Sequence, residues 1–169
     1  MLRSSMKRVA VVAVVASARV LGGVIDPANA QDHDLVLPAG VACADFDLGL
    51  DFGVDSRNLH EFTDAEGNVR AILAGRANSV TLTNLDTGAT LLIGAKGSMW
   101  NIVNHPDGTS TITTNGHLVL ILFPTDVPAG PSTTLYVGRV VFTFENTTGF
   151  TTLQGDKGTA TDLCAALSG

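Results

Sequence analysis

Apolar and polar residues alternate without a break between Asp45 and Asp55. The apolar side chains are Phe46, Leu48, Leu50, Phe52 and Val54, and the positions between them hold only Asp and Gly. A period of two is typical of a strand with one buried face. We interpret the aspartates as a solvated edge that resists aggregation, and not as a calcium site, because strand residues four apart are separated by about 13 Å.

Three β-hairpins are predicted after this strand. Each consists of two short apolar runs joined by residues that favour turns, such as Gly, Asn, Asp and Pro. The paired runs are 59–63 with 69–74, 79–84 with 89–94, and 98–104 with 110–115.

The runs 117–123 and 133–145 are apolar on both faces, which predicts strands that are covered on two sides. Between them, the segment 124–132 contains three prolines. Proline cannot donate to a strand ladder, so we expect this segment to be a connection outside the sheet. A last strand is predicted near 150–154, and 161–167 suggests a short C-terminal helical turn.

This pattern predicts an all-β fold, an antiparallel meander of about eight to ten short strands. We expect the meander to close as a β-barrel, with a β-sandwich as the alternative, since sequence does not fix closure. The domain spans 43–169 and is preceded by an extended segment, 31–42.

Residues 1–30 have the features of a signal peptide. Basic residues precede an apolar run at 9–16, and Ala28-Asn29-Ala30 supplies the small residues that signal peptidase cuts after. We expect cleavage after Ala30 and a secreted, extracellular protein. The alternative is an uncleaved anchor, which is disfavoured because Arg19 interrupts the apolar stretch.

The net charge of the chain limits the classes of molecule that it is expected to bind. The chain has 10 basic and 16 acidic residues, and the leader removes four of the former and one of the latter, so the exported protein carries a net charge of −9. A nucleic-acid partner is therefore not expected, because phosphate backbones are bound by clustered Lys and Arg. No second long apolar stretch follows, so no membrane span is expected.

The chain has two cysteines, Cys43 and Cys164. In an oxidising compartment the simplest expectation is one disulfide between them. A bridge that closes a loop of this length would stabilise the fold by about 4 to 5 kcal/mol in the chain-entropy account.

Three segments, 37–43, 123–139 and 161–167, carry a resemblance to a known group of proteins. With them, the chain resembles uncharacterised secreted proteins of actinobacteria over essentially the whole exported part. The resemblance implies a bacterial exported protein, and it implies no activity, substrate or cofactor.

Candidate chemistry is sparse. The four histidines have no metal-ligand spacing, and Ser98 lacks the glycines of a nucleophile elbow, so we predict no catalytic residue, no metal and no cofactor. The candidate ligand pocket consists of strand-borne aromatic and polar side chains, which we expect to be Trp100, Tyr136, Arg139 and His117.

The sequence therefore favours a secreted non-catalytic β-barrel that binds a small apolar molecule or an extracellular protein. A homodimer would also cover the doubly apolar strands. The alternative function is a barrel enzyme, an isomerase or cyclase acting on a hydrophobic substrate, which rests on analogy between folds alone.

Overall fold

The computed structural model describes residues 33–65, 67, 69–94 and 96–169. This part of the chain is all-β, with one short C-terminal helix, as predicted. Its strands are β1 (Leu35–Leu37), β2 (Leu48–Phe52), β3 (Ser56–Thr63), β4 (Val69–Arg76), β5 (Val80–Asn84), β6 (Thr90–Ile93), β7 (Met99–Asn104), β8 (Thr109–Leu122), β9 (Ser132–Glu145) and β10 (Thr151–Asp162), and the helix is α1 (Leu163–Ser168). The predicted signal peptide lies outside the described residues.

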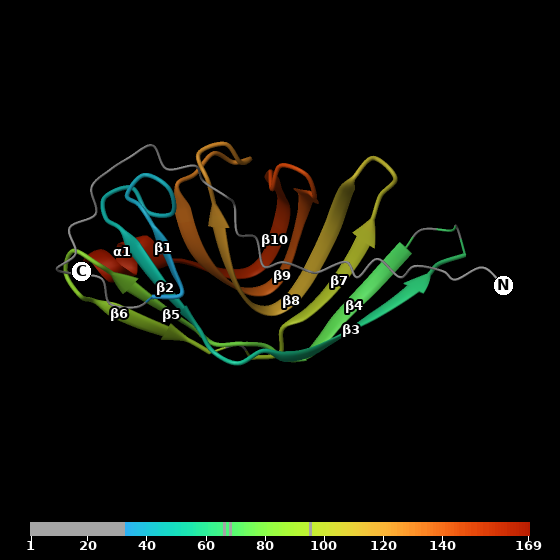
Figure 1. Cartoon of the computed structure of the whole chain (residues 1–169), viewed down its shortest axis with the longest axis horizontal. Coiled ribbons are helices and arrows are strands. Elements are labelled where there is room, and N and C mark those ends of the chain that lie inside the picture. Colours follow the sequence, from blue (N-terminus) through green and yellow to red (C-terminus); the bar gives the residue numbers. More distant parts are fainter. Residues whose placement is uncertain (1–32, 66, 68, 95) are drawn as a thin grey trace.

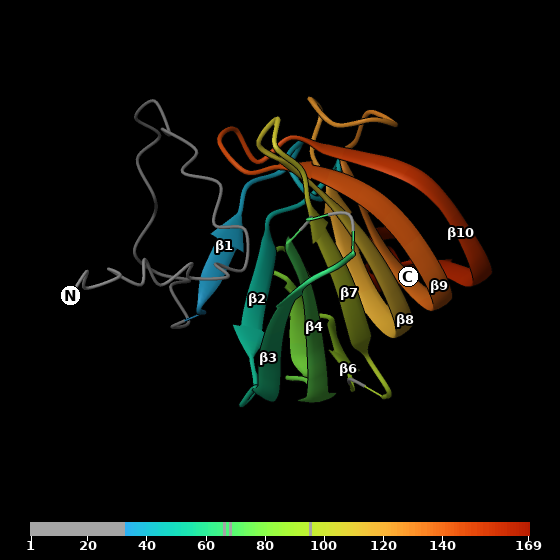
Figure 2. The same cartoon turned by 90° about the vertical axis from the view of Figure 1, so that its right-hand side faces the viewer.

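The strands form two antiparallel sheets. One has four strands in the order β1-β2-β5-β6, and the other has six in the order β10-β9-β8-β7-β4-β3. The chain passes between the sheets three times, from β2 to β3, from β4 to β5 and from β6 to β7. Figures 1 and 2 show the six-stranded sheet as a curved trough with the four-stranded sheet on one side. The predicted closed barrel is not found in the described residues, because each sheet has two unpaired edges.

A row of glycines bends the three longest strands. We predicted separate strands at 110–115 and 117–123, but β8 is one strand of 14 residues that continues through Gly116. Gly116 pairs with Gly138 of β9, which pairs in turn with Gly158 of β10. All three have positive φ, a conformation that residues with a Cβ rarely adopt. Each of these strands therefore turns a corner at the same level and appears as a U in Figure 1.

The acidic strand was placed wrongly at an edge. β2 is shorter than the alternating run, and it lies between β1 and β5. Two aspartates of the alternating run are partnered: the Asp51 carboxylate lies 2.9 Å from Nδ1 of His33, and Asp47 accepts a hydrogen bond from the Ala39 N–H. These side chains attach the N-terminal segment to the sheet.

Two hydrophobic clusters stabilise the fold. The first contains Leu48, Leu50 and Leu82 of the four-stranded sheet and Leu163 and Leu167 of α1. The predicted disulfide between Cys43 and Cys164 is confirmed, with a Cα–Cα distance of 5.6 Å, and both cysteines pack in this cluster. The second cluster covers one face of the six-stranded sheet.

The connection 123–131 crosses the open side of the U. Asp126 is buried and uses both carboxylate oxygens, one accepting from the Phe123 N–H at 2.7 Å and the other from the Thr151 N–H at 2.8 Å. Val127 then forms an isolated parallel bridge with Thr152. The end of β8 is thereby tied to the start of β10. We call residues 123–131 the strap.

Candidate functional site

The six-stranded sheet has two chemically different faces. Successive side chains on a strand point to opposite faces, so the register assigns each residue to one of them. We call the face that carries the second hydrophobic cluster the inner face, since it lines the concavity of the trough. The opposite face is the outer face. Its part beyond the glycine bend, at Val119, Ile121 and Leu135, is covered by the first cluster.

Trp100, the one tryptophan of the chain, lies on the inner face. Its ring meets Phe142 edge to face, with centroids 6.3 Å apart, and its indole N–H donates to the Ser98 hydroxyl at 3.0 Å. The Arg57 guanidinium lies over the indole, 5.3 Å from the ring centroid. The ring and the polar group of Trp100 therefore both have partners within the protein.

Arg57 is held in this place by Asp55. The Arg57 Nε donates to the Asp55 carboxylate at 3.0 Å, and the Arg57 backbone N–H donates to the same group at 2.9 Å. The hydrogen bond from the guanidinium is the main cause that holds the pKa of Asp55 below its ordinary value. The pair fixes the orientation of Arg57 over Trp100.

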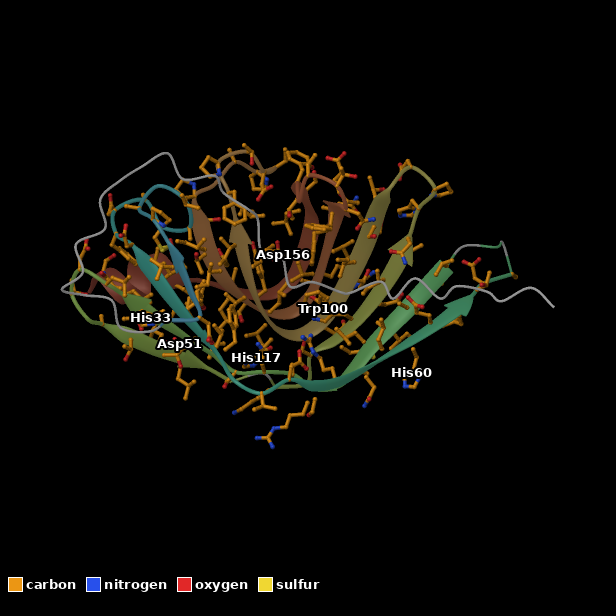
Figure 3. The ribbon with its side chains drawn as sticks, in the orientation of Figure 1. His33, Asp51, His60, Trp100, His117 and Asp156 are labelled. Carbon is orange, nitrogen blue, oxygen red and sulfur yellow. A yellow bond between two sulfur atoms is a disulfide. The ribbon has the colours of Figure 1, made fainter. Side chains whose placement is uncertain are left out.

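Tyr136 packs against the same inner-face cluster. Burial raises the pKa of the Tyr136 hydroxyl, and the negative charge of Asp156 raises it further. Asp156 pairs with Val140 in the register and lies in the concavity in Figure 3. This corner of the inner face therefore disfavours a second negative charge.

The structure does not bring the four predicted pocket residues together. Trp100 and Tyr136 share the inner face, whereas His117 and Arg139 occupy the alternate positions of β8 and β9 and lie on the outer face. The His117 Nδ1 lies 3.0 Å from the Gly94 carbonyl oxygen, and Arg139 is exposed. Counting positions along β9 would have separated Tyr136 from Arg139, because they are an odd number of residues apart.

Two hollows lie beside the bend that Gly116, Gly138 and Gly158 form in the six-stranded sheet. The larger, of about 400 Å³, is lined by Val54, Ser56, Arg76, Ala77, Ser79, Gly94 and Lys96. The smaller, of about 280 Å³, is lined by Arg139, Val141, Gln154, Gly155, Asp156 and Lys157. Each contains two cations. We call Arg76, Lys96, Arg139 and Lys157 the cation row.

Three members of the cation row, Arg76, Lys96 and Lys157, are not among the pocket residues that the sequence indicated. Their proximity depends on strand register, which brings Lys157 of β10 opposite Arg139 of β9. A sequence signal exists only for Arg57, since Asp55 stands two residues before it, the spacing at which extended residues share a face.

Within the described residues, no group of three or more His, Cys, Asp or Glu side chains could hold a metal ion. No helix there is long and apolar enough to cross a membrane. No protein-family model matches the chain, and the searches of curated proteins and of solved structures found no match. The arrangement of the residues is therefore the basis for a functional proposal.

Proposed function

We propose that the protein is a secreted, non-catalytic binding protein that holds an extracellular partner on the outer face of its six-stranded sheet. The contrast between the two faces is the observation that carries this proposal. The inner-face aromatics contact one another, Ser98 and Arg57. The outer face instead presents exposed apolar side chains at Met99 (44% exposed) and Val137 (37% exposed), next to cations.

Export is supported by two independent features. The first 30 residues have the charge, the apolar run and the small-residue site of a signal peptide. The disulfide between Cys43 and Cys164 is of the kind that persists outside the reducing cytosol.

A macromolecular partner fits this surface better than a small apolar ligand. Sites for such ligands are concave and mostly apolar. Each of the hollows described above has two cations in its lining, and neither hollow includes Trp100 or Tyr136. The barrel enzyme of our alternative hypothesis would bind its substrate inside a closed barrel, and the described residues form two open sheets instead.

Native mass spectrometry of the protein purified from its own culture medium tests this proposal. We expect a single species with the mass of residues 31–169 less the two hydrogens of the disulfide. A small molecule that stays bound in the native protein and is lost on denaturation would contradict the proposal in favour of a carrier. A homodimer would contradict it in favour of self-association.

A further inference from the structure

Most of the positive charge of the described chain is free of ion pairs and is gathered in one place. The described residues contain six Arg and Lys side chains. Asp55 binds Arg57, and Asp64 binds Arg70. The other four form the cation row, and none of them has an ion pair within the described residues.

Two members of the cation row lie on neighbouring strands at the glycine bend, and the other two, Arg76 and Lys96, line the larger hollow beside it. Arg139 of β9 pairs with Lys157 of β10 on one side and with Asn115 of β8 on the other. The backbone N–H of His117 donates to the Lys96 carbonyl oxygen at 3.3 Å, and Lys96 shares its hollow with Arg76. Adjacent strands lie about 4.8 Å apart, so the four steps from β4 to β10 extend over about 19 Å.

This row stands out against the net charge of the chain. An exported protein with a net charge of −9 repels anions in general. Asp156 also lines the smaller hollow, but its register partner is Val140 of the inner face. An anion that approaches the bend from outside therefore meets four cations, two of which are arginines able to bind a carboxylate or sulfate through two hydrogen bonds.

We propose that the partner is an acidic polysaccharide, a linear sugar polymer with carboxylate or sulfate groups, lying along the cation row. This inference rests on the proposed function and names its partner class. A linear polymer matches cations that are spread across the sheet over about 19 Å, at the strand spacing. The neutral outer-face side chains beside it, Thr113 and Asn115, supply a hydroxyl and an amide for sugar hydroxyl groups.

Other anionic partners fit less well. Protein interfaces are enriched in Trp and Tyr at their centres, but the one Trp and the one Tyr of this chain lie on the inner face. Duplex nucleic acid is bound by a broad field of cations, and four residues on an acidic protein do not provide one.

The test is binding of the exported protein to dextran sulfate and to polygalacturonate, with neutral dextran and polyglutamate as the comparison polymers. We expect both acidic polysaccharides to bind and neutral dextran not to bind. Arg139→Gln should weaken binding by about fivefold to tenfold at low salt. It should also reduce the slope of log affinity against log salt concentration by about one. Replacing all four cations of the row by Gln should abolish binding.

Arg70→Gln is the matched control, because it removes the same charge from a guanidinium already bound by Asp64. We expect it to change the affinity less than twofold. Unchanged Trp100 fluorescence in every variant would report an intact fold. Three results would each overturn the proposal. They are polysaccharide binding that survives loss of the four cations, no polysaccharide binding by the unchanged protein, and equal affinity for polyglutamate. If no polysaccharide binds and native mass spectrometry shows a single species, only the polysaccharide proposal fails. If native mass spectrometry shows a bound small molecule, the proposed function itself fails.

Discussion

Gly138 and Gly158 face each other across β9 and β10, with φ values of +143° and +138°. A Cβ added to Gly138 would lie 2.1 Å from the Lys157 carbonyl oxygen, and one added to Gly158 would lie 2.1 Å from the Val137 carbonyl oxygen. The bend that separates the exposed part of the outer face from the part covered by the first cluster therefore requires glycine in both strands.

We predict that Gly138→Ala lowers the free energy of unfolding by about 2 kcal/mol or more, because it combines a strained φ with a backbone clash. Gly155→Ala is the control, since no atom lies within 4 Å of its Cβ and its φ is not in the left-handed region. The control should change stability by about 0.5 kcal/mol or less. Urea unfolding measures both, and equal midpoints for the two variants would refute the role of the glycine row.

The strap depends on Asp126. Its buried carboxylate accepts from two backbone N–H groups, so Asp126→Asn leaves one of them facing an amide N–H₂. We expect a loss of about 2 kcal/mol in the free energy of unfolding. Asp107 is the matched control, because it also accepts two hydrogen bonds, both from Thr109, but is exposed. Asp107→Asn should leave the urea midpoint nearly unchanged, and a comparable loss in both variants would contradict this account of the strap.

Two buried threonines provide an opposed pair of predictions. The Thr114 hydroxyl has no hydrogen-bond partner, whereas the Thr133 hydroxyl donates to the Ala42 carbonyl oxygen at 3.0 Å. Valine has the same shape as threonine without the hydroxyl. Thr114→Val should therefore raise the free energy of unfolding by about 1 kcal/mol, and Thr133→Val should lower it by about 1 kcal/mol. Thermal unfolding measures the two shifts, and shifts of the same sign would refute this assignment.

Tyr136 gives a pH prediction with a single reporter, since it is the one tyrosine of the chain. Its pKa is raised by burial and by Asp156, so the phenolate should form at higher pH than in the unfolded protein. Because the unfolded state loses this proton first, stability should fall as the pH rises above about 10 and towards the folded pKa. In an absorbance titration Asp156→Asn should lower the pKa of Tyr136. An unchanged titration would exclude Asp156 as a cause.

Several features of the fold could be predicted from the sequence. Period-two alternation located Leu48 and Leu50 on the buried face of one strand, and the two cysteines implied their disulfide. The polar half of β10 at 155–162 was missed, because an exposed edge strand is held by backbone hydrogen bonds and shows no apolar alternation. Gly116 was interpreted as a break, although positive φ turns the strand without ending its ladder.

The candidate site was less predictable for a physical reason. Trp100 and Tyr136 were grouped because both are aromatic residues on strands, and both pack on the inner face. Arg139 and Lys157 become neighbours only through the β9–β10 register, which includes a bulge between Leu153 and Gly155. One inserted residue reverses which side chains face outwards, so no period in the sequence could place Lys157.

An NMR titration of the protein with polygalacturonate tests the central claim, that the partner binds the outer face at the cation row. We predict amide shift changes concentrated at Arg76, Lys96, Asn115, Arg139 and Lys157, while the single indole N–H signal of Trp100 stays in place. Changes at the Trp100 indole with the cation row unmoved would put the partner on the inner face and contradict the account.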